Sequence, residues 1–438
     1  MKRRSTAIFV ALILLARNGV SGADAAPLEA GFARRSLVTQ FSWISLAGYG
    51  GRALLPATGV HDETYVKVMV LRTPDGAVAI VTFDLIGVQR SLLTGVEAQP
   101  FPARVELDSD HILYTASHTH AGYGRLAQRT GAWGLDSLFL FAVGFFHQGF
   151  FDETVGRVHE AIVEAWDDLE PAMLGAGSGV VKGLSRNRGR KRGPTDPELG
   201  VIKVTDREGA LRGLLVNFTA HPILLGIDNF KLSAGYPGSM QRALEELHPG
   251  ITALFINGAE GDQSIRVSKR NHPDDWSRME HAGQRLARNV DRIQQAIEVR
   301  EDVPIAMNQL EVEMPVPETR WLRWKRTGAP DTSIVSQVVL GDTLLLGYPG
   351  EPCVQIGLDH KQRAKRLGFR QVFAVGLAQD HLGYFVHESD YAPGRSDSHD
   401  YEKQYNFYGP KIGDFFGEVH FERLDPRPLA PRSTEAAN

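Results

Sequence analysis

Apolar and polar residues are arranged as paired short runs at three places along the chain, a pattern typical of β-hairpins. Residues 64–88 read TYVKVMVLRT-PDG-AVAIVTFDLIGV, in which Pro-Asp-Gly separates two apolar runs and favours a turn. Residues 201–218 repeat the design around a charged turn, and residues 336–347 repeat it around Gly341 and Asp342. The pattern therefore predicts at least three pairs of neighbouring antiparallel strands.

Two longer segments instead repeat apolar residues every three or four positions, as amphipathic helices do. We expect Asp152 to cap the first helix, whose apolar face is Val155, Val158, Ile162 and Trp166. We expect Asp275 to cap the second, whose apolar face is Trp276, Met279, Gly283, Leu286, Val290, Ile293 and Ile297. Hairpins mixed with helices predict the α/β class: a layered sandwich of mixed β-sheets flanked by helices, in a single large catalytic domain rather than a regular βα barrel.

The N-terminus has the composition of a secretory signal peptide. Lys2, Arg3 and Arg4 precede the apolar run at residues 7–16, and small residues follow around Ala23-Asp24-Ala25. The run is short for a membrane span, although an uncleaved anchor is the alternative interpretation. We therefore expect a signal peptide over residues 1–25, a hydrolase domain over 26–425, a tail over 426–438, and a periplasmic or secreted protein.

Composition narrows the class of protein further. The 438 residues include 42% hydrophobic and 23% charged residues, so the chain can bury a substantial core. A formal net charge of −4 argues against a nucleic-acid partner that is held mainly by phosphate contacts. Because Cys353 is the single cysteine, the chain forms no internal disulfide, which suits a bacterial envelope protein.

Chemically reactive residues collect where five apolar runs end. Because the ends of strands are rigid and the loops after them are open to solvent, we expect these residues to share one pocket. The residues that follow the five runs are His118, His120, His221, Asp262, Ser264, Glu351 and Tyr384.

His118 and His120 are separated by a single residue, so both would face the same side if they lay in a strand. The pair could be metal ligands, a general base with its helper, or two structural polar residues. Together with His221 and Glu351 it offers the nitrogen and oxygen donors of a catalytic zinc site with a position left for water.

The other residues also have structural interpretations. Glu351 could cap a helix that begins near Val354, Tyr384 could be a core aromatic, and Ser264 could form a turn.

Eight segments occur in the order found in one enzyme family, and together they span nearly the whole chain after the signal. On these segments the sequence resembles the N-terminal catalytic domain of the neutral/alkaline (non-lysosomal) ceramidase family. The segments are SHTHAG (117–122), SRNRG (185–189), NFTAHP (217–222), SAGYPG (233–238), INGAEGDQS (256–264), GYPGEP (347–352), HLGYFVHESDY (381–391) and NFYGP (406–410).

The resemblance implies a zinc ion held by His118, His221, Glu351 and Tyr384. Such a site suits hydrolysis of an amide, because zinc activates water at neutral pH. The implied activity is hydrolysis of ceramide or a related sphingolipid to a fatty acid and a sphingoid base, by a zinc-activated water. A lipid amide substrate also leads us to expect transient contact with a membrane surface.

Further roles follow from the resemblance and from the needs of amide hydrolysis. His120 would lie near the amide and protonate the leaving amine, and Tyr384 would also stabilise the oxyanion. Arg188 would help to hold the polar head of the substrate. Ser264 matches a residue that is a nucleophile or an essential hydrogen-bonding group, and Asp262 could orient His120 or a ligand histidine.

Several departures from the family pattern surround the expected pocket. Ala121-Gly122-Tyr123 stands where the family has Ser-Gly-Pro, Gly235 stands for an aspartate, and Ile265 stands for a proline. They leave open two alternatives: a zinc hydrolase of the same fold acting on a non-lipid or differently headed amide, and a non-catalytic binding protein of the envelope.

Two more segments bear on the comparison with the family. The apolar stretch 136–151 could be a core helix or a wall for an acyl chain. Fewer than about 30 residues follow Pro410, too few for the β-sandwich-like domain of the long family members.

Overall fold

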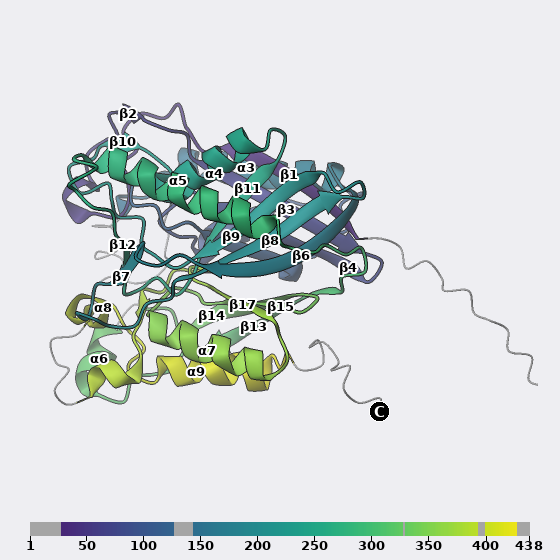
Figure 1. Ribbon diagram of the computed structural model, residues 1–438. Helices are drawn as coiled ribbons and strands as arrows, with labels where there is room; N and C mark the ends of the chain where they lie inside the picture. Colours follow the sequence, from purple (N-terminus) through teal and green to yellow (C-terminus); the bar gives the residue numbers. More distant parts are fainter. Residues whose placement is uncertain (1–27, 127–142, 327–328, 393–398, 427–438) are drawn as a thin grey trace, which may run out of the picture.

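The structure is a computed structural model that describes residues 28–126, 143–326, 329–392 and 399–426 (Figure 1). The predicted signal peptide, nearly all of the predicted tail and residues 136–142 of the apolar stretch lie outside the described residues. Within the described part, none of the helices is both long enough and apolar enough to cross a membrane.

A mixed sheet of eight strands forms one half of the molecule. Two of the predicted hairpins lie in it, as the antiparallel pairs β3–β4 and β8–β9, and both predictions are confirmed. The strands, in spatial order, are β11 (Thr252–Asn257), β9 (Leu211–Phe218), β8 (Glu198–Asp206), β6 (Glu170–Val180), β1 (Glu29–Ser36), β3 (Tyr65–Thr73), β4 (Gly76–Phe83) and β5 (Ile112–Ala116).

A second sheet of four strands faces the first (Figure 1). It contains the third predicted hairpin, β14–β15, and pairs β15 with β17 in parallel. Its strands, in spatial order, are β13 (Ile305–Glu313), β14 (Thr332–Leu340), β15 (Thr343–Gly347) and β17 (Gln371–Val375). Three two-stranded pairs complete the strands: β10 (Lys231–Leu232) with β2 (Gly59–Val60), β12 (Gln263–Ile265) with β7 (Ser185–Asn187), and β16 (Glu351–Pro352) with β18 (Tyr384–Phe385).

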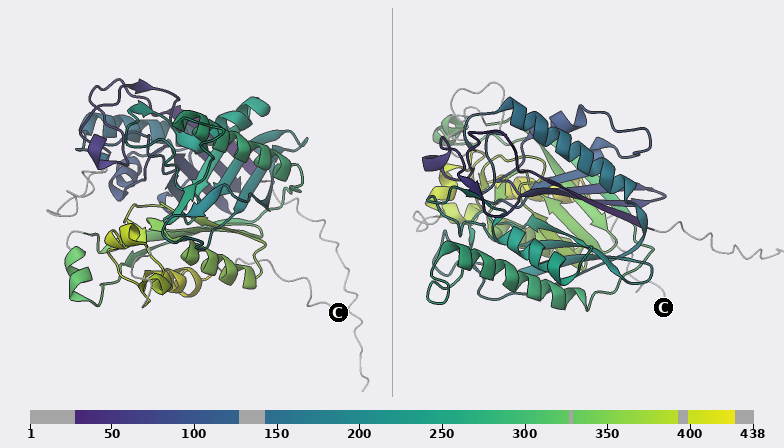
Figure 2. Two further views of the ribbon diagram at one scale, coloured as in Figure 1. Left: turned by 60° about the vertical axis from the view of Figure 1, so that its left-hand side comes forward. Right: turned by 90° about the horizontal axis from the view of Figure 1, so that it is seen from above.

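Helices cover the outer face of each sheet, so the molecule has four layers in the order helix, sheet, sheet, helix (Figures 1 and 2). α3, α4 and α5 contact the large sheet, and α7 contacts the small one. The predicted sandwich of mixed sheets is therefore confirmed. The helices are α1 (Arg90–Glu97), α3 (Gln148–Asp167), α4 (Gly235–Leu247), α5 (Asp275–Gln294), α6 (Arg320–Lys325), α7 (Val354–Arg366), α8 (Asp400–Gln404) and α9 (Ile412–Glu418), with short helical turns at Gly50–Arg52, Ser109–His111, Glu388–Tyr391 and Val419–Arg423.

Both predicted helices exist, but their caps differ from the prediction. α3 begins one turn earlier than expected, and its cap is His147, whose ring accepts a hydrogen bond from Phe150 N. The buried Phe150 and Phe151 extend its apolar face toward the N-terminus. α5 is capped by Asp274, one residue before the expected aspartate, and it ends before Ile297.

The joint between the two sheets lies just after β17. Thr115 Oγ1 donates to Gly376 O at 2.9 Å, which fixes this segment to β5 at one edge of the large sheet. Gly376 N donates to Asn257 O at 3.1 Å, at the opposite edge strand, β11. Gln379 N donates to Tyr114 O at 2.9 Å. The ends of β5, β11 and β17 therefore meet at one place, although they are far apart in the sequence.

Burial of aliphatic and aromatic side chains between the sheets provides the main stabilisation of this joint. The core between them contains side chains from both sheets, such as Ile80, Ile202, Leu254, Val338 and Phe373.

We expect Phe373→Ala to lower the free energy of unfolding by about 3–5 kcal/mol, because the ring is 1% exposed and its removal leaves a cavity. Phe145→Ala is the matched control: that ring is 57% exposed, so the change should cost about 0.5 kcal/mol or less. Urea denaturation of both variants measures the difference. Equal losses in the two would contradict the assignment of this core.

Candidate metal centre

His118 and His120 come together through a turn, not through a strand. β5 ends at Ala116, and His118 has a left-handed backbone with φ of 67°. This conformation is unfavourable for residues other than glycine and is commonly found at functional sites. The two Nε2 atoms lie 3.3 Å apart. The expectation that both rings face one site holds, but the expected alternation along a strand does not cause it.

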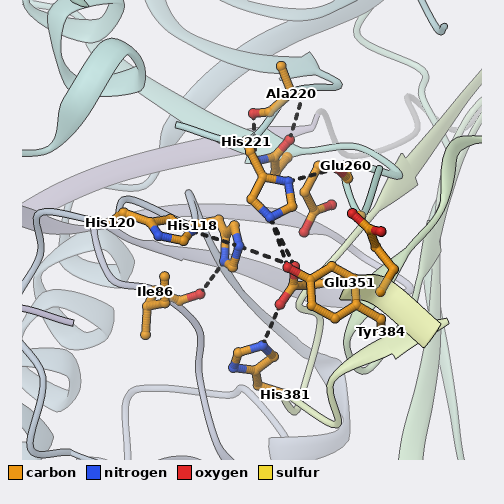
Figure 3. A network of polar contacts seen from close by, with 12 residues as sticks. Ile86, His118, His120, Ala220, His221, Glu260, Glu351, His381 and Tyr384 are labelled. Carbon is orange, nitrogen blue, oxygen red and sulfur yellow. Dashed lines mark hydrogen bonds and ion pairs between the residues drawn. The ribbon is translucent and has the colours of Figure 1, made fainter. Parts of the chain in front are cut away.

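Backbone carbonyls determine which ring nitrogen of His118 and of His221 is free. His118 Nδ1 lies 2.6 Å from Ile86 O, and His221 Nδ1 lies 2.8 Å from Glu260 O (Figure 3). A carbonyl only accepts hydrogen bonds, so each Nδ1 carries the proton and each Nε2 keeps a lone pair. Both lone pairs are therefore available to a cation, in the arrangement typical of metal-binding histidines.

Glu351 and Tyr384 complete the group from the other sheet. The short strands β16 and β18 run parallel and place Glu351 directly opposite Tyr384. Glu351 Oε2 lies 3.3 Å from His118 Nε2 and 3.1 Å from His221 Nε2. The Tyr384 hydroxyl lies 3.3 Å from His221 Nε2. All four residues that the resemblance implied as ligands are therefore neighbours, and all are buried.

The spacing of these atoms fits zinc. Neighbouring ligand atoms that share one zinc ion at bonds of about 2.0–2.1 Å lie about 2.8–3.6 Å apart in four- to six-coordinate sites. The observed spacings of 3.1–3.3 Å fall within this range. Nitrogen lone pairs that face a carboxylate in a buried site are also unfavourable unless a cation or a proton lies between them. The donor set thus has both the geometry and the charge that a divalent cation requires.

The pKa values follow from burial and from the neighbouring charges. Burial and the neighbouring His118 lower the pKa of His120 well below its usual range, and burial lowers the pKa of His221 to about 3. Burial acts to raise the pKa of Glu351, but the facing histidines outweigh it and hold this pKa well below the usual range. Neutral imidazoles and an ionised carboxylate are the states in which these side chains bind metals.

A pocket of about 470 Å³ opens onto this group. Arg188 lies on its wall, where Nη2 donates to the Tyr384 hydroxyl at 2.8 Å and Nε donates to Glu402 at 2.8 Å. His120 lines the same pocket, as do the rings of Tyr49 and Tyr401. The pocket therefore gives access from solvent to His120, Arg188 and Tyr384, three of the residues singled out from the sequence.

The structure places Asp262 and Ser264 beside the group rather than in it. Asp262 accepts hydrogen bonds from Val354 N at 2.8 Å and from Asn187 Nδ2 at 2.5 Å. Asp262 therefore caps the start of α7. The sequence alone had allowed this role for Glu351. Asp262 also contacts His399 Nε2 at 2.9 Å and Gln263 Nε2 at 3.0 Å, and among the described residues none of its hydrogen bonds runs to His118, His120 or His221.

Ser264 is buried in β12, where its hydroxyl lies 3.2 Å from Arg186 Nε. Its backbone forms a parallel bridge with His221, and His221 N donates to Gln263 O at 3.0 Å. Through this bridge the segment around Ser264 fixes the position of His221.

Three residues of the site were not expected from the sequence. His381 Nε2 lies 2.9 Å from Glu351 Oε1, Glu260 lies against the ligand group, and His399 binds Asp262. His381 and Glu260 are in segments that carry the resemblance, and both directly follow apolar runs. The position after a strand was therefore an available signal for these two, whereas His399 is more than a hundred residues from its partner.

His399 makes stability depend on pH. Burial acts to lower its pKa, but the hydrogen bond to Asp262 and the ion pair with Asp390 raise the pKa to about 9, whereas a histidine in an unfolded chain titrates near 6.5. Between these values the folded state holds one more proton than the unfolded state, so this contribution is full below pH 6.5 and is lost as pH rises through 9.

We therefore expect the wild-type free energy of unfolding to fall between pH 6.5 and 9, relative to that of His399→Asn. Urea denaturation of both proteins at a series of pH values measures the difference. A constant difference over this range would show that His399 does not titrate in this way.

Comparisons with known proteins were consistent with the geometry. No family model matches the chain. The neutral ceramidase of Pseudomonas aeruginosa is 23% identical over 283 residues, which are 60% of this chain. The match spans 41% of the length of that relative.

Solved structures match over more of the chain. The crystal structure of neutral ceramidase from Pseudomonas aeruginosa has a TM-score of 0.81 and 18% identity, over 93% of this chain and 76% of that one. A structure of ceramidase complexed with C2 has a TM-score of 0.79 and 17% identity, over 94% and 77% of the two chains. The chain therefore has a neutral ceramidase-like fold.

Proposed function

We propose that the chain is a zinc-dependent amidase that hydrolyses the N-acyl amide bond of ceramide or a related sphingolipid. The products would be a fatty acid and a sphingoid base. The observation that carries the proposal is the buried group of His118, His221, Glu351 and Tyr384, whose donor atoms are spaced as ligands of one metal ion beneath an open pocket. The similarity to neutral ceramidase supports the choice of substrate.

These four residues would hold the zinc. When bound, zinc lowers the pKa of a water ligand to about 7 and polarises a carbonyl group. His118 and His221 are oriented for this by their Nδ1 contacts to the backbone. His381, at 2.9 Å from Glu351 Oε1, fixes the carboxylate from the side away from the two ligand histidines (Figure 3).

Proton transfer would be the task of His120. Its ring is neutral at pH 7, because burial and the neighbouring histidines lower its pKa. It can therefore take a proton from the attacking water and deliver it to the leaving amine. Its position on the pocket wall gives it access to the scissile amide.

Tyr384 and Arg188 would act on the substrate carbonyl and its polar head. Arg188 donates to the oxygen of Tyr384 at 2.8 Å, so the phenol proton would be able to point toward a developing oxyanion once His221 Nε2 and Glu351 hold the metal. Arg188 also lines the pocket, where the head group of the substrate would lie. Asp262 would not touch the substrate in this scheme. It would fix the positions of His399 and of the start of α7 through its hydrogen bonds.

A second substrate class is favoured by the wall of the pocket. Arg188, Glu402 and the hydroxyls of Tyr49 and Tyr401 offer many polar groups around the opening. Such a wall would also suit an amide with a smaller or more polar head than ceramide. The metal centre and the chemistry would be the same.

The proposed setting is the periplasm or the exterior of the cell, with transient contact to a membrane surface. It rests on the signal-like sequence at residues 1–25. The third interpretation, a binding protein without catalysis, is disfavoured because the whole donor set is assembled with the spacing of a metal site.

Replacing His118 or Glu351 with alanine tests the function. We expect each variant to lose bound zinc and the release of fatty acid from a fluorescent ceramide in detergent, since each removes a ligand. His248→Ala is the control, because that ring pairs with Asp291 and is remote from the ligands. Full zinc occupancy in both variants would contradict the ligand assignment. Intact zinc without ceramide cleavage, but with cleavage of a more polar N-acyl amide, would favour the second substrate class.

Ser264→Ala separates the two roles open for that serine. We expect turnover to stay within about tenfold of the wild-type value, because the hydroxyl contacts Arg186 and the bridge to His221 is made by the backbone. Single-turnover assays with the same ceramide would measure the rate. A loss of about 10³-fold or more with normal zinc content would instead identify Ser264 as a covalent nucleophile.

A further inference from the structure

Glu260 has a buried carboxylate that receives no hydrogen bond from the described part of the protein. Its side chain is fully buried, directly after β11, and neither carboxylate oxygen has a hydrogen-bond partner among the described residues. Its backbone carbonyl is satisfied, since it accepts from His221 Nδ1 at 2.8 Å and from Gln263 N at 2.7 Å. A buried carboxylate in this state is strongly unfavourable unless a cation or a proton compensates it.

The surroundings do not supply that compensation. Arg188 is the cation of this region, and its hydrogen bonds go to Glu402, Gly261 O and Tyr384. A second carboxylate, that of Glu351, instead lies within 4.8 Å of Glu260. Two carboxylates side by side repel each other, so the group needs positive charge between them.

The Glu260 side chain points into the ligand group. One oxygen of Glu260, one of Glu351 and a ring nitrogen of His118 all lie within 4.8 Å of one another (Figure 3). Because His118 Nδ1 is engaged with Ile86 O, the available nitrogen is Nε2, which faces the proposed zinc. Glu260 is therefore directed at the same point in space as the four implied ligands.

The backbone at Gly376 makes this placement possible. A Cβ atom on Gly376 would come within 2.3 Å of Glu260 Oε2, so any other residue there would push the carboxylate away. Gly376 also belongs to the joint between the sheets. The joint that assembles the site thus leaves room for this carboxylate.

We propose that Glu260 is a further ligand of the metal centre, a second carboxylate beside Glu351. This inference rests on the metal centre of the proposed function. Two carboxylates neutralise a divalent cation, and a fifth ligand raises the coordination number above four. The larger share of oxygen ligands makes the site suitable for Co²⁺ and Mn²⁺ as well as Zn²⁺.

The proposal is tested by metal affinity. Apo protein, prepared with a chelator, is titrated with Zn²⁺ against a chromophoric competitor. We expect Glu260→Gln, which keeps the size and removes the charge, to weaken zinc binding by about 10–100-fold. Glu245→Gln is the matched control, because Glu245 is neutralised by ion pairs with Lys67 and Arg34 and contacts none of the proposed ligands, so the zinc affinity of that variant should be unchanged.

Thermal unfolding gives a second measurement that separates metal binding from a purely structural role. The increase in Tm on adding Zn²⁺ should be smaller in Glu260→Gln than in wild type, because the ion binds the folded state of the variant less tightly. An increase equal to that of wild type would contradict the proposal.

The wild-type protein provides a measurement that does not depend on any variant. With Co²⁺ in the site, the visible absorption should be the weak spectrum of a five- or six-coordinate ion. An intense four-coordinate spectrum would overturn the proposal, as would unchanged zinc affinity in Glu260→Gln. If His118→Ala loses zinc while Glu260→Gln does not, this inference alone fails. If His118→Ala keeps its zinc, the proposed metal centre fails with it.

Discussion

The Glu351 carboxylate is the group on which the rest of the site depends. It is buried, and it faces His118 and His221 through one oxygen and His381 through the other. An anion in this position is stabilised only by what surrounds it, and the three rings come from two different sheets. Its ionised state therefore requires that the sheets meet in one register. Burial alone would raise its pKa, and the histidines reverse the effect.

That register is set by a short segment after β17. Gly376 and Gln379 bond to the ends of both edge strands of the large sheet. The edges of an open sheet are ordinarily exposed and available for other contacts. Here the two edges are brought to the same segment, so each contributes a loop to the pocket: His118 follows one edge strand and Glu260 follows the other. A rigid sheet thus holds donors that are more than a hundred residues apart in sequence.

Much of this arrangement could be predicted from the sequence, and the features that could not be predicted have physical causes. Hairpins were predictable because their alternation and turns are local, and the five strand ends were predictable because apolar runs end abruptly in polar residues. The left-handed backbone of His118 was not predictable, because only tertiary contacts stabilise it. The predicted helix caps were wrong by five residues in α3 and by one in α5, since burial of Phe150 and the choice between two adjacent aspartates are decided by packing. The partner of Asp262 could not be found, because His399 approaches it only in the folded chain.

Chemistry and substrate choice lie in different parts of the molecule. The proposed ligands and His120 directly follow strands or lie in the short β16–β18 pair, where the backbone is fixed by the sheets. Tyr49, Tyr401 and Glu402 come from loops and a short helix around the opening. Changes in these outer elements alter the pocket without moving a donor atom. Tyr123 and Ile265, two of the departures from the family pattern, are buried and do not line the pocket. Arg188 and these outer residues form its wall instead. In the proposed function, the outer elements would therefore select the substrate, and the joint between the sheets would hold the metal.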